Sequence, residues 1–184
     1  MGLNYRKLAV LGIITLLTAC TGIPSTVQPV GQFDLNKYLG QWYEVARLDH
    51  SFERGLDNVS AFYSSNEDGT VKVVNRGWDN EENEWSEAEG KAKFVSTPDI
   101  AHLKVSFFGP FYGSYVVYYL EDDYSVALVS GYNLDYFWLL SRSPTLPQGA
   151  LERYIQIADS AGFDTDSLIF PNQDKAQLTT KKAD

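Results

Sequence analysis

The segment Gly40-Gln41-Trp42-Tyr43-Glu44-Val45-Ala46-Arg47 opens the folded body of the chain. It contains aromatic and β-branched residues and no proline, which is typical of a β-strand. Side chains alternate between the two faces of a strand, so Trp42 and Glu44 share one face. We expect a strand over Gly40–Arg47, and the segments that follow decide what it pairs with.

Seven further segments have the same strand-like composition, and several alternate apolar and polar residues with a period of two. They cover residues 59–64, 71–76, 85–95, 103–107, 114–121, 126–131 and 136–142. Short connectors with Gly, Asp, Asn and Pro favour antiparallel pairing in chain order. Pro147 then begins a helical pattern near 147–161, which Gly162 ends. We predict an all-β fold, an eight-stranded antiparallel up-and-down barrel with one C-terminal α-helix packed outside.

An eight-stranded barrel is either filled by side chains or lined around one small ligand. The fourth predicted strand places Ala88, Gly90 and Ala92 on one face and charged residues on the other. The charged face belongs outside, so the small residues point inward. The pattern predicts space inside the barrel.

The chain has 184 residues, a net charge of -9 and one cysteine. An acidic body is repelled by nucleic acid, so we expect no nucleic-acid partner. Cys20 alone permits neither an internal disulfide nor a cysteine-based zinc site. We expect no metal and no cofactor.

The N-terminus reads as an export signal. Arg6 and Lys7 precede an apolar run that is short for a membrane span. Residues 17–20, Leu-Thr-Ala-Cys, resemble the lipobox of bacterial lipoproteins. That resemblance implies a signal peptide over 1–19, cleavage before Cys20 and lipidation of Cys20. With Thr21 rather than Asp next, it implies a lipid anchor in the outer membrane, facing the periplasm.

The two ends of the body lack periodic patterns. Residues 20–31 contain two glycines and two prolines, and we expect a flexible tether there. Residues 171–184 are polar, and we expect a disordered tail. The barrel itself is expected over 32–170.

Three motifs in order resemble the lipocalin family: Gly40-Gln41-Trp42, Asp122-Asp123-Tyr124 and Arg142 at the end of the last strand. The second departs from the family's Thr-Asp-Tyr at its first residue. Longer stretches, such as 103–113 and 138–142, are similar to the bacterial outer-membrane lipocalins. The resemblance implies that Gly40, Trp42 and Arg142 are structural, with the guanidinium over the indole.

The resemblance also implies the function. It suggests an outer-membrane lipoprotein that binds, stores or transports fatty acids such as palmitate, or lysophospholipids, for membrane maintenance under stress. Members of this type also form homodimers. Two other hypotheses stay open: a lipid-modifying enzyme, for which no nucleophile motif is visible, and a partner-binding envelope protein with a filled barrel. We expect no enzymatic activity.

Alternation phased from Trp42 and Arg142 gives the expected inward face. The predicted ligand-binding residues are Ala61, Tyr63, Val73, Asn75, Ala88, Leu103, Val105, Phe107, Tyr115, Val117, Tyr119, Val129, Tyr136, Trp138 and Leu140. At the mouth we expect Phe52, Arg54, Phe111 and Tyr112. Glu44 also points inward and needs a partner there, for which Arg142, Asn75 or a tyrosine hydroxyl are candidates.

Overall fold

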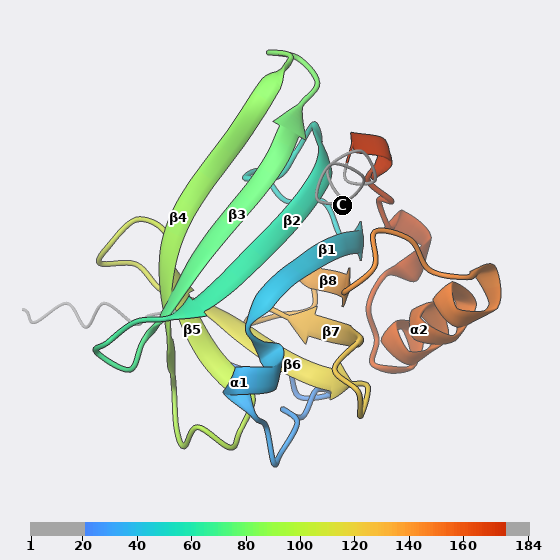
Figure 1. The fold of residues 1–184 in the computed structure, drawn as a ribbon. Coiled ribbons are helices and arrows are strands. Elements are labelled where there is room, and N and C mark those ends of the chain that lie inside the picture. The colour runs from blue at the N-terminus through green and yellow to red at the C-terminus, as the bar shows by residue number, and fades with distance from the viewer. Residues whose placement is uncertain (1–20, 176–184) are drawn as a thin grey trace, which may run out of the picture.

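Eight antiparallel strands close into a barrel in the computed structural model, which describes residues 21–175 (Figure 1). Each strand pairs with the next in the chain, and β8 pairs with β1. The strands are β1 (Gly40–Arg47), β2 (Leu56–Ser65), β3 (Val71–Asp79), β4 (Glu84–Phe94), β5 (His102–Ser106), β6 (Gly113–Leu120), β7 (Val126–Ser130) and β8 (Phe137–Ser141). The predicted fold class is confirmed.

One end of the barrel is closed by the short helix α1 (Leu35–Tyr38) and by Trp42, which is fully buried. The Arg142 guanidinium lies 3.9 Å from the Trp42 ring centroid. Arg142 also donates to the carbonyl oxygens of Gln41, Tyr38 and three other residues. Gly40 has a φ of +95°, which an L side chain rarely adopts. We call this closed end the floor.

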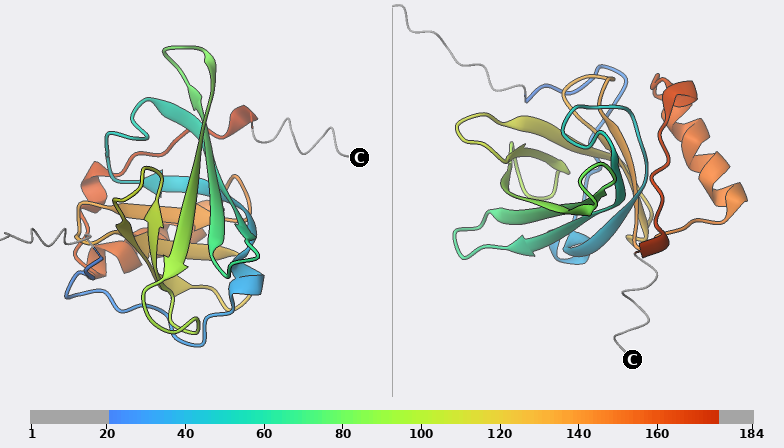
Figure 2. Two further views of the ribbon diagram at one scale, coloured as in Figure 1. Left: turned by 90° about the vertical axis from the view of Figure 1, so that its left-hand side faces the viewer. Right: turned by 90° about the horizontal axis from the view of Figure 1, so that it is seen from above.

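The helix α2 (Gln148–Ser160) packs against the outside of the barrel, and Figure 2 shows it beside the strands rather than across an end. Tyr154 and Ala158 of α2 are buried in an outer apolar cluster with residues of β6, β7 and β8. A 3₁₀ turn, η1 (Thr165–Ser167), follows. The predicted helix is therefore present and lies where it was expected.

The expected flexible tether is bound to the barrel along residues 21–31. Val27 is buried in the outer cluster beneath α2. The Val30 amide donates to the Val117 carbonyl, and Gly31 bridges to Ile100. The tether prediction was wrong for these residues because Gly and Pro marked an extended segment that carries its own apolar anchor.

The expected disordered tail is ordered over residues 171–175. Gln173 is buried and donates to the carbonyl oxygens of Glu44 and Val59, at 2.8 and 2.9 Å. The polar composition of this segment suggested disorder. The Gln173 amide nevertheless holds the segment in place, because it hydrogen-bonds backbone carbonyl groups of two strands. The predictions for residues 1–20 and 176–184, including Cys20, lie outside the described residues. Among residues 21–175, no helix is long and apolar enough to span a membrane.

Candidate ligand-binding cavity

The barrel interior holds a cavity of about 90 Å³ that continues into a larger pocket of about 590 Å³ at the mouth. Six residues line both spaces: Phe52, Glu53, Val59, Asn75, Val105 and Phe107. The mouth pocket has the volume typical of small-molecule sites. The barrel is therefore open at the end opposite the floor, and its middle is only partly filled by side chains.

Ten of the predicted residues line the inner cavity. They are Ala61, Tyr63, Val73, Asn75, Leu103, Val105, Phe107, Tyr115, Trp138 and Leu140. They come from β3, β5 and β8, where alternation was regular, and from β2 and the first half of β6, where the choice of face was ambiguous. Ala88 instead lines the mouth pocket.

The other four predicted residues line neither space. Val117 and Val129 are fully buried in the core cluster inside the barrel. Tyr136 lies beside the opening, where its ring stacks on those of His50 and Trp138. Tyr119 lies on the outside, against Tyr154 of α2.

A β-bulge explains the error at Tyr119. The register of β6 against β7 shifts between Val117 and Tyr119, so one extra residue enters the strand. A bulge places two residues opposite one and reverses the alternation beyond it. Tyr119 therefore faces outward, where its hydroxyl donates to Glu121.

The small residues of β4 create less space than the sequence suggested. A Cβ atom on Gly90 would lie 2.8 Å from ring carbons of Phe107, so the Phe107 ring occupies the room that Gly90 leaves. Ala92 does line the inner cavity. The hollow thus depends on Ala92 and Ala61 more than on Gly90.

The predicted mouth residues divide into two groups. Phe52, Phe111 and Tyr112 line the mouth pocket. Arg54 does not; its side chain is 64% exposed and pairs with Asp49 at 2.6 Å. Arg54 is therefore a solvated arginine in this structure and is not aimed into the pocket.

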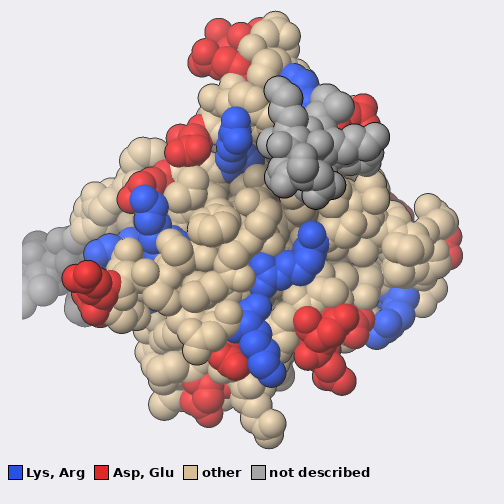
Figure 3. Space-filling model, in the orientation of Figure 1, with Lys and Arg blue, Asp and Glu red and all other residues tan. Residues whose placement is uncertain are grey.

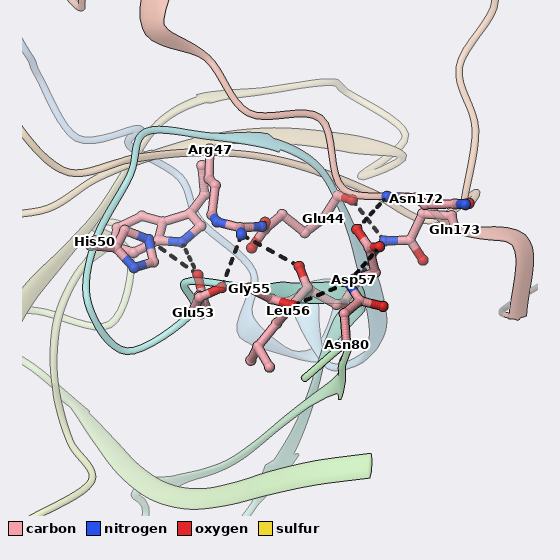
Figure 4. A network of polar contacts seen from close by, with 12 residues as sticks. Glu44, Arg47, His50, Glu53, Gly55, Leu56, Asp57, Asn80, Asn172 and Gln173 are labelled. Carbon is pink, nitrogen blue, oxygen red and sulfur yellow. Dashed lines mark hydrogen bonds and ion pairs between the residues drawn. The ribbon is translucent and has the colours of Figure 1, made fainter. Parts of the chain in front are cut away.

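A buried polar network lies between the mouth and the inner cavity (Figure 4). Arg47 Nη1 lies 2.6 Å from Glu44 Oε1, and its Nη2 donates to the Glu53 carbonyl at 2.9 Å. His50 Nε2 lies 3.1 Å from Glu53 Oε2, which also accepts from the Trp138 indole at 3.0 Å. The lid loop, residues 48–55, is thereby fastened to the inner wall of β1 and β8.

Arg47 is the partner that Glu44 needs, and sequence phasing missed it. The pairing of β1 with β8 shifts between Glu44 and Ala46, so a bulge returns Arg47 to the interior face. The three partners proposed from sequence, Arg142, Asn75 and a tyrosine hydroxyl, make no hydrogen bond to Glu44 among the contacts of residues 21–175. Gln173, which binds the Glu44 carbonyl, comes from the far end of the chain.

The two carboxylic acids of this network have opposite pKa directions. Burial, followed by the neighbouring Glu53 carboxylate, raises the pKa of Glu44 well above its ordinary value, against the effect of Arg47. For Glu53, burial raises the pKa, but His50, Trp138 and Arg47 together outweigh it and the net pKa is lowered. The network therefore favours one negative charge, on Glu53.

The deep end of the cavity carries three phenols. Tyr115 Oη lies 2.7 Å from Tyr38 Oη and 2.9 Å from Tyr63 Oη. Burial raises the pKa of all three hydroxyls, so they are neutral in the physiological range. Sequence analysis found Tyr63 and Tyr115 but missed Tyr38, which α1 supplies along with Leu35.

Three further missed residues come from a loop, from the segment before α1 or from an irregular part of a strand. Phe33 precedes α1, Glu53 is in the lid loop, and Val59 lies beside the β2 bulge. A Leu35/Tyr38 pair three apart was the one signal that could have placed α1 over the cavity. Within residues 21–175, no group of three or more His, Cys, Asp or Glu side chains is arranged to hold a metal ion.

Comparison with known proteins agrees with this geometry. Residues 33–173 match the family described as Lipocalin-like domain. "Outer membrane lipoprotein Blc" of Vibrio cholerae serotype O1 is 57% identical over 86% of this chain and 93% of that protein. The protein of the same name from Escherichia coli K12 is 46% identical, over 86% and 90% of the two chains. Insecticyanin from the tobacco hornworm Manduca sexta superposes with a TM-score of 0.66 at 22% identity, over 84% and 88%, which shows the fold alone.

Proposed function

Because the chain belongs to the lipocalin family, we propose that its barrel binds a lipid with a single acyl chain, either a fatty acid or a lysophospholipid. One observation carries the proposal: an apolar cavity that is sealed at the floor and open at the mouth. The acyl chain occupies the mouth pocket and reaches into the inner cavity, and the Glu44–Arg47–Glu53 network lies beside its path. Lipocalins are in general binding proteins rather than enzymes.

The chain is an outer-membrane lipoprotein, a localisation supported by its similarity to relatives of that name and by the lipobox-like residues 17–20. Two or more acyl chains on one residue meet the two-chain requirement for stable anchoring. We further propose that the barrel stores or transports its lipid for membrane maintenance under stress. The proposal includes a homodimer, and lipid binding by one barrel does not depend on it.

The expected affinity is modest. Burying an acyl chain of roughly sixteen carbons contributes about 12 kcal/mol at about 0.8 kcal/mol per CH₂. Association opposes this with about 4–15 kcal/mol. We therefore expect micromolar binding that depends on chain length more than on the head group.

The test compares a variant that fills the cavity with a variant that changes only the surface. Ala61→Trp places an indole in the cavity, and Phe62→Trp, the control, introduces the same residue type on the exposed face of the same strand. Binding of palmitate and of lysophosphatidylethanolamine is measured by native mass spectrometry and by titration. We expect A61W to weaken both at least tenfold and F62W to leave both unchanged.

Circular dichroism shows whether each variant is folded. If A61W does not fold, Ala92→Phe fills the same cavity from β4. The proposal is rejected if the wild-type protein takes up neither lipid. It is also rejected if a folded cavity-filling variant binds both lipids as well as F62W does.

A further inference from the structure

The first described residues lie at the mouth of the barrel, beside its loops. Thr21 hydrogen-bonds His102 through its backbone, and His102 Nε2 lies 3.0 Å from Ser114 Oγ at the start of β6. A Cβ atom on Gly22 would lie 3.8 Å from the Tyr132 carbonyl oxygen in the β7–β8 loop. The chain therefore enters the fold between the β5–β6 and β7–β8 connections, both of which border the open end (Figure 2).

The β7–β8 loop is tied to the lid by aromatic contacts. The Tyr132 ring lies 5.4 Å from that of Tyr136, which stacks on His50 of the lid loop at 6.1 Å. The His50 ring also contacts Trp138, which lines the inner cavity. The entry point of the chain and the entrance of the cavity thus belong to one side of the molecule.

The same side carries exposed apolar side chains. Phe108 and Phe111, in the β5–β6 loop, are 81% and 68% exposed, and Phe52 in the lid loop is 58% exposed. All three line the mouth pocket. Ile23 and Tyr132, at the entry point, are also exposed. Exposed apolar groups gathered at one place mark an interaction surface. We call Phe52, Phe108 and Phe111 the mouth rim.

We propose that the mouth rim docks into the lipid leaflet that holds the anchor, so that the cavity opens onto the protein's own membrane. Cys20 directly precedes Thr21, so its acyl groups enter the bilayer beside the mouth. This anchoring keeps the rim at a high effective concentration near lipid, where phenylalanine side chains partition favourably. The identity of the bound lipid rests on the proposed function. The side of the barrel that faces the membrane follows from the position of the anchor and does not depend on the ligand.

The charge distribution selects which part of the mouth approaches the lipid. The turn between β3 and β4 carries Glu81 and Glu82, flanked by Asp79 and Glu84. Figure 3 shows acidic groups at the tip of the molecule where this hairpin projects. Anionic groups are disfavoured at a membrane surface that bears phosphate. The barrel therefore tilts with the β5–β6 loop toward the lipid and the hairpin tip away from it.

The test measures the depth of two positions in the acylated, full-length protein on vesicles. Cys20 is the only native cysteine, and its thiol is consumed by lipidation, so one introduced cysteine can be labelled alone. Gly109→Cys places a nitrobenzoxadiazole dye between Phe108 and Phe111 without removing either. Glu67→Cys places it in the β2–β3 turn at the floor end. The vesicles contain phosphatidylethanolamine with spin-labelled lipid as quencher.

We expect the dye at residue 109 to be quenched at least threefold more than the dye at residue 67. Phe108→Ser with Phe111→Ser should abolish that difference in the G109C protein. Equal quenching at both positions, or stronger quenching at residue 67, overturns the proposal. So does a dye at residue 109 that is shielded without lipid in a protein that sediments as a dimer, because a second copy then covers the rim.

Failure of docking and failure of lipid binding are separable. The quenching experiment needs no bound cargo, and the A61W titration needs no membrane. Loss of lipid uptake with the quenching difference intact would reject the proposed function and keep the orientation. Lipid uptake without a difference in quenching between residues 109 and 67 would keep the proposed function and reject the membrane docking.

Discussion

At the scale of single residues, Arg142 connects three parts of the chain at the floor. Its guanidinium covers Trp42 of β1, and its donors reach carbonyl groups of α1 and of the β6–β7 loop. Hydrogen bonds from a charged donor contribute about 1.5–3 kcal/mol each when one partner would otherwise be unpaired. These contacts explain why an arginine at the end of the last strand accompanies a tryptophan in the first.

We expect Arg142→Ala to lower the free energy of unfolding by about 2–4 kcal/mol in urea titration. Arg142→Lys should recover little of it, because an ammonium lacks the planar fork that spans several carbonyl groups. Arg54→Ala is the control, since Arg54 is exposed and pairs only with Asp49 among its described contacts; it should lower the free energy of unfolding far less than Arg142→Ala does. Equal losses for both arginines would contradict the structural role of Arg142.

Glu44 gives a prediction about pH. Its pKa is raised in the folded protein, so the native state holds the proton more tightly than the unfolded chain does. Stability from this group is therefore complete below about pH 4.3, the ordinary glutamate pKa, and is lost as pH rises through the folded pKa. Glu44→Gln should remove this loss.

The measurement is the free energy of unfolding of wild type and E44Q at pH 4 and pH 8. Relative to wild type, E44Q should gain stability from pH 4 to pH 8, because glutamine has no proton to lose as the pH rises through the raised pKa of Glu44. The opposite trend, in which E44Q becomes relatively weaker at pH 8, would show that Glu44 is ionised and held by Arg47.

At the scale of elements, one glycine of β4 lets the aromatic residue that follows β5 pack directly against the β4 backbone. Gly90 has no Cβ, and the Phe107 ring takes that space. Gly90→Ala should destabilise the barrel by about 1–3 kcal/mol, because overpacking forces a side chain or strand to move. Phe107→Ala in the G90A background should relieve the clash, so the two losses are less than additive. Additive losses in thermal or urea unfolding would mean that the two positions do not interact.

The strands also show how far sequence reasoning extends. Regular alternation placed Leu103, Val105 and Leu140 correctly, and the helix pattern placed α2 to within two residues. Alternation failed beyond the bulges of β1 and β6, at Arg47 and Tyr119. No glycine or proline marks either bulge, so the local sequence contains no signal for the extra residue. The lid and the 171–175 segment depend on contacts distant in sequence, which periodicity cannot report.

At the scale of the whole molecule, the N-terminal segment is part of the folded body. Val27 fills the outer cluster between barrel and α2. Val27→Ala should lower the free energy of unfolding by about 1–2 kcal/mol, from two lost methyl groups and the cavity that remains. Gln28→Ala, at an exposed neighbouring position, should change it by less than about 0.5 kcal/mol. Equal small effects would mean that residues 21–31 detach in solution, as the original tether prediction had it.

The attachment of residues 21–31 also limits how far the protein can travel. Pro24 is already buried, so four residue steps at most separate it from Cys20, which is about 14 Å of fully extended chain. A connection this short keeps the barrel close to the membrane that holds its anchor, so the bound lipid cannot reach a distant bilayer while the barrel stays anchored. If residues 21–31 stay attached, the barrel exchanges lipid only with the membrane that holds its anchor, and transfer to another membrane needs a second carrier.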